Sequence, residues 1–172
     1  MEIEMLVKKA KQGDKEALVQ LIMAEKQDYY KLAYVYMKNS EDAMDAMEDM
    51  IVILYESIYR LKSESSFYSW SKTILVNCCK SSLKKKSKVV LLDQLQEETQ
   101  NSFTEQKDEQ LRLEKHLCEL NSKQQEAIRL RYFMDMDYQN IAELLKIPVG
   151  TVKSRISIGL SKLKAVIGGE EL

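Results

Sequence analysis

Apolar residues recur at intervals of three and four along most of this chain, the spacing that places them on one face of an α-helix. Between residues 14 and 37 the pattern predicts a helix that begins at Asp14. Its apolar positions are Leu18, Leu21, Ile22, Leu32, Ala33 and Tyr36. A second helix is predicted over residues 41–60, because Ser40 is a good N-cap and the acids that follow suit the positive end of a helix dipole.

A short polar segment, LKSESS, separates these helices from a third. It covers residues 61–66, and Ser66 is expected to cap a helix from Phe67 to about Lys86. Residues 87–105 then lose the helical periodicity, and Gln, Glu, Ser, Thr and Asn dominate from Gln94 on. We interpret this segment as a flexible, acidic, solvated linker; a weaker alternative is that it shields a basic face of the unbound protein.

The helical pattern resumes near Gln106. The leucines that predict the next helix are Leu111, Leu113, Leu117 and Leu120. Asn121 or Ser122 is expected to cap a further helix, and the sequence MDMD at 134–137 is expected to follow its end. The sequence thus predicts a domain over residues 1–88, a linker over 89–105 and a second domain over 106–172.

Two helices joined by a short turn close the chain. The first is predicted over residues 138–146, and the turn Ile147–Gly150 leads into the second. Pro148 discourages continuation of the first helix, Gly150 permits a tight backbone, and Thr151 is expected to cap the second helix. Two helices with a turn of this length are typical of a helix-turn-helix motif.

The last helix is predicted to have an apolar stripe, and the pair Gly168–Gly169 is expected to end it. The stripe consists of Val152, Ile156, Leu160, Leu163 and Ile167. The opposite face carries Ser154, Ser157, Ile158 and Ser161, with Lys153 and Arg155 on its flanks. In a helix-turn-helix the N-terminal part of this helix enters the DNA major groove. The alternative is a core helix whose solvated face is basic by chance. Ile158 itself suits either a thymine methyl group or a neighbouring protein surface.

The composition favours an all-α fold of two small helical domains, because five Gly and one Pro in 172 residues are too few for the turns of a β-rich fold. The net charge is only −1, yet charge is segregated along the chain. Residues 41–50 hold five acids and no base, and residues 80–88 hold five lysines and no acid. Residues 93–109 hold six acids and one lysine, and residues 151–166 hold four bases and no acid. Blocks of one sign indicate separate surfaces with separate partners.

Nothing in the sequence points to a cofactor or a metal site. Of the three cysteines, Cys78 and Cys79 are adjacent, so reduced and partly buried thiols are expected. A metalloprotein that uses these thiols with His116 and Cys118 is disfavoured, because no matching Cys-x-x-Cys pair is present. No Gly-rich phosphate loop or catalytic Ser/His/Asp set is recognisable. The longest apolar run, Met50–Tyr55, is too short to span a membrane, so a cytoplasmic protein is expected.

The segment LNSKQQEAIRLRYFMDMDYQNIAELLKIPVGTVKSRISIGLSKLK, residues 120–164, closely resembles the C-terminal domain of bacterial RNA polymerase sigma factors of the extracytoplasmic-function (ECF) group. Residues 28–58 resemble the sigma segment that binds the polymerase clamp. Residues 65–86 resemble the segment that captures and opens the promoter −10 element, and Phe67, Trp70 and Asn77 fall on its characteristic positions. Ser71 and Ile158 depart from the family, which usually has a leucine and a basic residue there.

The resemblance implies that the partners are core RNA polymerase (its β′ clamp and β flap) and promoter DNA, with no small-molecule substrate. It also implies an anti-sigma factor, which in this group is often membrane-anchored. The polymerase-binding residues that it implies are Asp42, Asp45, Glu48 and Asp49. The −10 residues are Lys62, Ser63, Ser65, Ser66, Asn77, Lys80 and Lys84, with Lys85, Lys86 and Lys88 as further phosphate contacts. The −35 residues are Thr151, Lys153, Ser154, Arg155, Ser157 and Ile158.

Two points stay open at the level of sequence. Phe67 and Trp70 suit a core role better than a role as stacking platforms for unpaired bases. The main rival function is an autonomous helix-turn-helix activator or repressor, in which residues 1–86 sense a signal or dimerise. A sigma factor binds promoters specifically only with core polymerase, whereas an autonomous regulator binds them alone.

Overall fold

The computed structural model describes residues 2–92 and 108–170, whose regular elements are helices with no strand among them. The predicted all-α class is thereby confirmed. The chain divides into two compact units, Met1–Leu92 and Asp93–Leu172. In the part of the chain that the structure describes, no helix is both long enough and apolar enough to cross a membrane. The predicted linker lies mostly in residues 93–107, outside the described residues.

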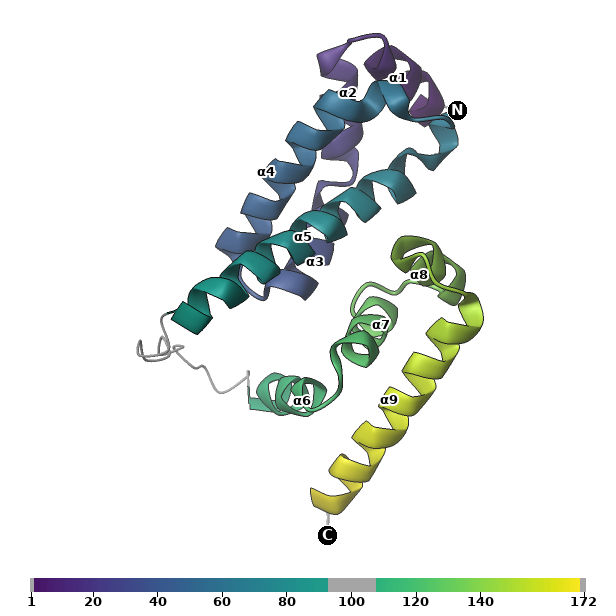
Figure 1. Ribbon diagram of the computed structural model, residues 1–172. Coiled ribbons are helices and arrows are strands. Elements are labelled where there is room, and N and C mark those ends of the chain that lie inside the picture. The colour runs from purple at the N-terminus through teal and green to yellow at the C-terminus, as the bar shows by residue number, and fades with distance from the viewer. Residues whose placement is uncertain (1, 93–107, 171–172) are drawn as a thin grey trace. The chain divides into compact units, whose positions relative to one another are not determined.

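The first unit is a bundle in which α3, α4 and α5 pack against one another and α1 packs against α2 (Figure 1). Two 3-10 turns, η1 (Ile58–Arg60) and η2 (Glu64–Ser66), link α4 to α5. The helices are α1 (Glu2–Lys11), α2 (Lys15–Ala24), α3 (Lys26–Met37), α4 (Ser40–Ser57) and α5 (Phe67–Leu92).

The sequence pattern missed two features of this unit. The expected helix over 14–37 is two helices, because Glu25 leaves helical geometry with φ −118° and ψ 22°. No Gly or Pro marks this break; Lys72 on α5 holds the Glu25 carboxylate at 3.0 Å. The helix α1 was not expected at all, and Gly13, with φ 101°, makes the turn that folds it back onto α2.

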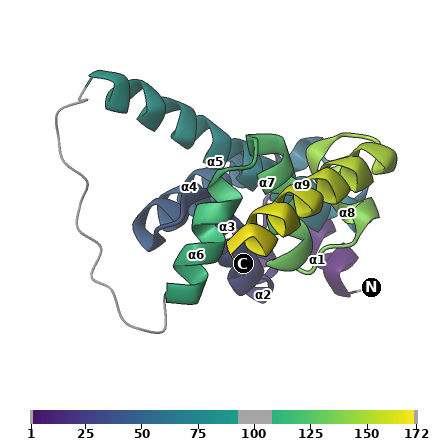
Figure 2. The same ribbon diagram turned by 90° about the horizontal axis from the view of Figure 1, so that it is seen from below.

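The cap and the end of two other helices also differ from expectation. Asn39, not Ser40, caps α4, because its side chain accepts from the backbone N–H of Asp42 at 2.8 Å. The helix α5 begins at Phe67 as expected but continues to Leu92, past the expected end near Lys86. Figure 2 shows its last turns extending beyond α4. The apolar sequence Val89–Leu92 contains no helix breaker, so the helix continues through it.

A buried hydroxyl pair lies inside the first unit. Tyr29 on α3 and Ser71 on α5 are both fully buried, and their hydroxyl oxygens are 2.8 Å apart. The Ser71 hydroxyl also donates to the carbonyl of Tyr68 at 3.0 Å, which leaves Tyr29 as the donor to Ser71. Burial raises the pKa of Tyr29 far above its usual range, so this hydroxyl stays protonated. Ser71, which stands where the family that the sequence resembles usually has a leucine, thus has Tyr29 as its partner.

In the second unit, α7 packs along α9, and α6 and α8 contact both (Figure 1). The helices are α6 (Asp108–Cys118), α7 (Ser122–Tyr132), α8 (Tyr138–Leu145) and α9 (Val149–Glu170). Asn121, one of the two expected candidates, caps α7, and Asp137 at the end of the MDMD sequence caps α8. The core residues include Leu117, Leu120, Ala127, Ile128, Leu130, Ile141, Val152, Ile156 and Leu163.

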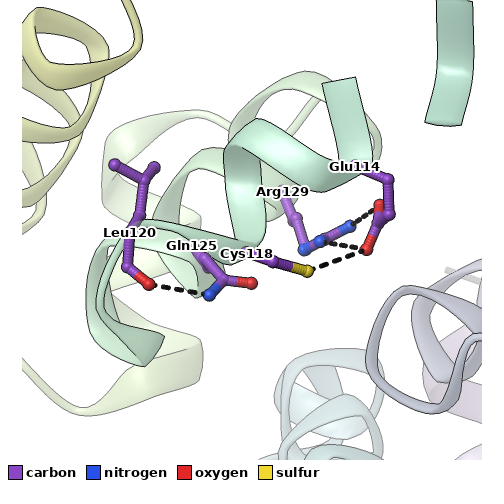
Figure 3. Close-up of polar contacts among 5 residues, drawn as sticks. All are labelled: Glu114, Cys118, Leu120, Gln125 and Arg129. Carbon is purple, nitrogen blue, oxygen red and sulfur yellow. Dashed lines mark hydrogen bonds and ion pairs between the residues drawn. The ribbon is translucent and has the colours of Figure 1, made fainter. Parts of the chain in front are cut away.

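One ion pair joins α6 to α7. The guanidinium of Arg129, which is 6% exposed, donates to both carboxylate oxygens of Glu114, at 2.9 and 2.5 Å. Figure 3 shows this fork, with Cys118 one turn further along α6 and Gln125 reaching the carbonyl of Leu120. Bidentate pairing with a nearly buried arginine fixes the angle between the two helices.

The turn between α8 and α9 uses other residues than predicted. Lys146 takes the left-handed conformation, with φ 58°, and the N–H of Ile147 reaches back to the carbonyl of Ala142 at 3.1 Å. Pro148 directly precedes α9 and its carbonyl accepts the N–H of Val152, so Thr151 lies inside the helix and is not its cap. Gly150 has no special backbone geometry, so the tight turn does not depend on it.

The apolar stripe of α9 also differs from prediction. Val152, Ile156 and Leu163 are buried as expected, whereas Leu160 and Ile167 are 37% and 39% exposed. Gly159 takes the inward position instead: a Cβ there would lie 2.5 Å from the Cδ1 atom of buried Ile128 on α7. The helix runs through the expected glycine stop to Glu170.

Removing either hydroxyl of the Tyr29–Ser71 pair should destabilise the first unit unequally. Ser71→Ala leaves the Tyr29 hydroxyl buried without an acceptor and should cost about 1–3 kcal/mol. Tyr29→Phe leaves Ser71 bonded to Tyr68 and should cost about 0.5–1.5 kcal/mol. The double variant should cost less than the sum. Urea unfolding followed by fluorescence of Trp70, the single tryptophan, measures all three, and strictly additive losses would contradict this pairing.

Filling the space at Gly159 should destabilise the second unit. Gly159→Val forces Ile128 out of its position and should cost about 1–3 kcal/mol, the usual penalty of overpacking. Gly168→Val is the matched control, because nothing lies within 4 Å of a Cβ at that position of the same helix. Thermal unfolding by circular dichroism compares the two variants. Equal stability would show that α7 and α9 do not meet as closely as described.

Candidate nucleic-acid interface

The six predicted −35 residues lie together on the N-terminal half of α9. Lys153, Ser154, Ser157 and Ile158 are exposed, and Thr151 and Arg155 are half-buried. They lie outside the buried stripe, because that stripe faces α7 and α8. The face therefore offers hydroxyl groups between flanking cations, a combination that suits base edges between phosphates.

A shallow depression of about 280 Å³ adjoins this face. On one side it is lined by α9, through residues that include Thr151, Ser154, Arg155 and Ile158. The other side comes from the start of α7 and its cap, and consists of Asn121, Lys123 and Gln124. Sequence reasoning did not assign these three residues to the site, because only the packing of α7 on α9 brings them there.

The opposite flank of the α9 face contains an aromatic ring with two cations near it. The Tyr138 ring, at the start of α8, has the guanidinium of Arg131 at 4.9 Å and the ammonium of Lys153 at 5.8 Å from its centroid. Arg131 also donates to the carbonyl of Met136 at 3.0 Å, which ties down the loop before α8. Lys153 thus has a neighbour that orients it, and Arg131 adds a charge that the sequence pattern did not single out.

A second polar surface runs along α5 in the first unit. Trp70, Thr73, Asn77, Lys80 and Lys84 follow one another at spacings of three and four, so they share one face of the helix. Asn77, Lys80 and Lys84 are exposed, and Trp70 and Thr73 are half-buried. This α5 stripe lies opposite the buried side that carries Leu75 and Cys79.

The two aromatic residues near the start of α5 differ in exposure. Phe67 is fully buried, which confirms its core role. Trp70 is half-buried, with its ring centroid 6.2 Å from that of Phe67. One side of the Trp70 ring therefore packs on the core while the residue heads the exposed α5 stripe.

The polar segment before α5, residues 61–66, is anchored at two of its residues. Leu61 is buried, and Lys11 on α1 pairs with Glu64 at 3.4 Å. The pKa of Glu64 lies below its usual value, chiefly because its own backbone N–H bonds to the carboxylate and then because of Lys11. Beside these anchors Lys62, Ser63 and Ser65 are exposed and Ser66 is half-buried. The Ser63 and Ser65 hydroxyl oxygens are 2.9 Å apart.

The predicted polymerase-binding acids lie on α4, but they do not share one environment. Asp45, Glu48 and Asp49 are exposed, whereas Asp42 is half-buried and forms an ion pair with Lys86 on α5. The exposed face of α4 also carries large apolar side chains that sequence reasoning did not assign to the site. Met44, Val52 and Tyr55 are exposed by 54%, 55% and 53%. A helix face that mixes carboxylates with exposed apolar groups is suited to a protein partner.

The cysteines take no part in these surfaces. Cys78 and Cys79 are buried free thiols, as expected, and burial raises the pKa of Cys78 and raises that of Cys79 to about 12. Cys118, exposed at the end of α6, is not in a disulfide, and its thiol donates to a carboxylate oxygen of Glu114 at 4.0 Å. Among the described side chains, no group of three or more His, Cys, Asp or Glu residues could hold a metal ion.

Comparisons with known proteins identify a family for each of the two units. Residues 21–89 match the family described as Sigma-70 region 2, and residues 110–163 match Sigma-70, region 4. The chain is 31% identical over 167 residues to RNA polymerase sigma factor SigV of Bacillus subtilis (strain 168), covering 95% of this chain and 99% of that protein. It is 30% identical over 166 residues to the ECF RNA polymerase sigma-E factor of Haemophilus influenzae, covering 88% and 87%.

Solved structures show the same fold. CnrH, in its complex with the cytosolic domain of CnrY, matches with a TM-score of 0.72 at 20% identity, over 98% of this chain and 99% of that one. RpoE of Bartonella quintana, in complex with the anti-sigma factor NepR, matches with a TM-score of 0.67 at 22% identity, over 88% and 96%. This chain belongs to the sigma-70 family of RNA polymerase sigma factors. Within that family it is of the ECF type, and its function is promoter-specific transcription initiation.

Proposed function

We propose that this chain binds core RNA polymerase, reads the −35 element as duplex DNA with α9, and opens the −10 element with residues 61–66 and the α5 stripe. Its action is binding, without catalysis, in the cytoplasm where polymerase works. The observation that carries the proposal is the exposed face of α9. That face has hydroxyl groups flanked by cations, in a run of sixteen residues, 151–166, that contains no acid.

The −35 part of the proposal divides the α9 residues by chemistry. Lys153 and Arg155 lie on opposite flanks, so they are placed for the phosphates on either side of the major groove. Lys123 beside Arg155 adds a third cation from α7. Thr151, Ser154 and Ser157 are small enough to let the helix approach base edges, to which their hydroxyls can donate or accept.

The −10 part rests on the α5 stripe and the segment before it. Lys80 and Lys84 lie one turn apart on the side of Asn77, so they can follow one strand while Asn77 contacts a base. The segment Lys62–Ser66 offers hydroxyl groups to a base that is taken out of the stack. Taking a base out of the stack costs a few kcal/mol, which contacts with these hydroxyl groups can offset. The anchors at Leu61 and Glu64 hold that segment in place before DNA binds.

The polymerase-binding part assigns Asp42, Asp45, Glu48 and Asp49 on α4 to the β′ clamp. The three exposed carboxylates repel DNA and favour a basic protein surface, and the apolar side chains beside them supply area to bury. Asp42 is paired with Lys86, so its role in this proposal includes holding the basic end of α5 against α4. The β flap is the proposed partner of the second unit.

An anti-sigma factor is the proposed inhibitor of the chain. CnrH and RpoE, which share this fold, were solved in complexes with CnrY and with the anti-sigma factor NepR. An inhibitor that covers the α4 face and the α9 face would block polymerase and DNA together. A membrane anchor, where present, belongs to that inhibitor.

Two substitutions on α9 test the proposal. Ser154→Ala removes a base contact and should lower −35-dependent run-off transcription with core polymerase by about fivefold or more. Lys153→Ala removes a phosphate contact and should weaken promoter binding by the holoenzyme on all sequences. The slope of the logarithm of the binding constant against the logarithm of salt concentration should become smaller in magnitude by about one.

Lys164→Ala is the matched control, because Lys164 is also exposed on α9 but lies beyond the reading face. It should change neither transcription nor the salt slope. Unchanged transcription from both Ser154→Ala and Lys153→Ala would show that the reading face is wrongly placed.

A further inference from the structure

Ile158 is an apolar side chain on a polar surface. It is 50% exposed, and its neighbours around the depression are Thr151, Ser154 and Arg155 on its own helix and polar residues at the start of α7. The fold does not require it there, because Val152, Ile156, Gly159 and Leu163 already fill the inward positions of α9. Its remaining apolar area is therefore available to something outside this unit.

The position of Ile158 on the helix limits what that partner can be. Residues 151, 154 and 158 lie at spacings of three and four, so Ile158 continues the line of Thr151 and Ser154 on one face of α9. Groups that approach this face meet hydroxyls and cations first. A duplex satisfies those groups through phosphates and base edges, and the apolar group that its major groove presents is the C5-methyl of thymine.

We propose that Ile158 contacts a thymine methyl group in the −35 element and makes this chain selective for thymine at one position. The inference rests on the proposed function and adds a specificity-determining residue to it. A β-branched side chain in a helix has one strongly preferred rotamer, so Ile158 presents its methyl groups in a fixed direction before DNA binds. The family's usual basic residue would contact a phosphate or a guanine there instead.

The experiment compares thymine with uracil, which differs only by that methyl group. Promoters are first selected by run-off transcription with the holoenzyme from a pool with randomised −35 and −10 elements. Each −35 thymine, on either strand, is then replaced in turn by uracil, and open-complex formation is measured. For the wild type, uracil at one position should reduce open-complex formation about three- to fivefold, the factor that corresponds to burying one methyl group.

Ile158→Ala should reduce open-complex formation on thymine DNA by a similar factor and should not respond to uracil at that position. Ile158→Val, which keeps the β-branch, should respond as the wild type does. Leu160→Ala is the matched control, because Leu160 is another partly exposed apolar residue of α9, on a different side of the helix. It should keep the full response to uracil. An exposed substitution of this kind changes stability little, so all three variants should fold.

Three results would overturn the inference. One is a wild type whose open-complex formation is unchanged by uracil at every −35 thymine, or a selected −35 element without thymine. Another is an Ile158→Ala variant that still responds to uracil as the wild type does. The third is an equal loss by Ile158→Ala on thymine and uracil DNA, which indicates a contact with polymerase. A holoenzyme that transcribes no promoter of the pool would instead refute the proposed function, and the inference with it.

Discussion

The close packing of α9 on α7 is the constraint on which the proposed DNA-binding surface depends. Val152, Ile156 and Leu163 bury one side of α9, and Gly159 lets the two helices approach to a distance that a Cβ would prevent. Burial of one side fixes the rotation of α9 about its own axis, and this also determines which residues lie on the opposite, exposed side. The hydroxyls and cations of α9 face outward for that reason, and the start of α7 comes to lie beside them.

In the first unit, the buried side of α5 likewise determines which residues are exposed, but here the buried side includes a polar pair. The inner side of α5 carries Ser71, which pairs with Tyr29, and the outer side carries the α5 stripe from Trp70 to Lys84. Charge segregation, hidden by a net charge of −1, then separates the surfaces by partner. The acids of α4 favour protein and the lysines of α5 favour phosphate, and the two sets meet in the pair of Asp42 with Lys86.

Most helices and their order could be predicted from periodicity, but not α1, and residue type alone narrowed the cap of α7 to Asn121 or Ser122, of which Asn121 is the cap. The break at Glu25 could not, because an ion pair with Lys72, distant in sequence, accompanies it and no Gly or Pro marks it. The prediction of Thr151 as the cap of α9 was wrong, because the carbonyl of Pro148 is the first acceptor of the helix. Leu160 was predicted to face the core, but Gly159 holds the inward position. Residue type alone cannot show where a neighbouring helix comes too close for a side chain.

The candidate site divides in the same way. The hydroxyls and cations of α9 could be chosen from sequence because they share one helix. Lys123, Arg131 and Tyr138 could not, because tertiary packing alone brings them beside that helix.

The central claim is that this chain opens promoters only as a subunit of RNA polymerase. Permanganate reactivity of thymines in the −10 element of a selected promoter tests it most directly, because unstacked thymines react and paired ones do not. Reactive −10 thymines are expected with core polymerase and the chain together, and none with either alone. Specific, tight promoter binding by the chain alone, or unreactive thymines in the full mixture, would contradict it.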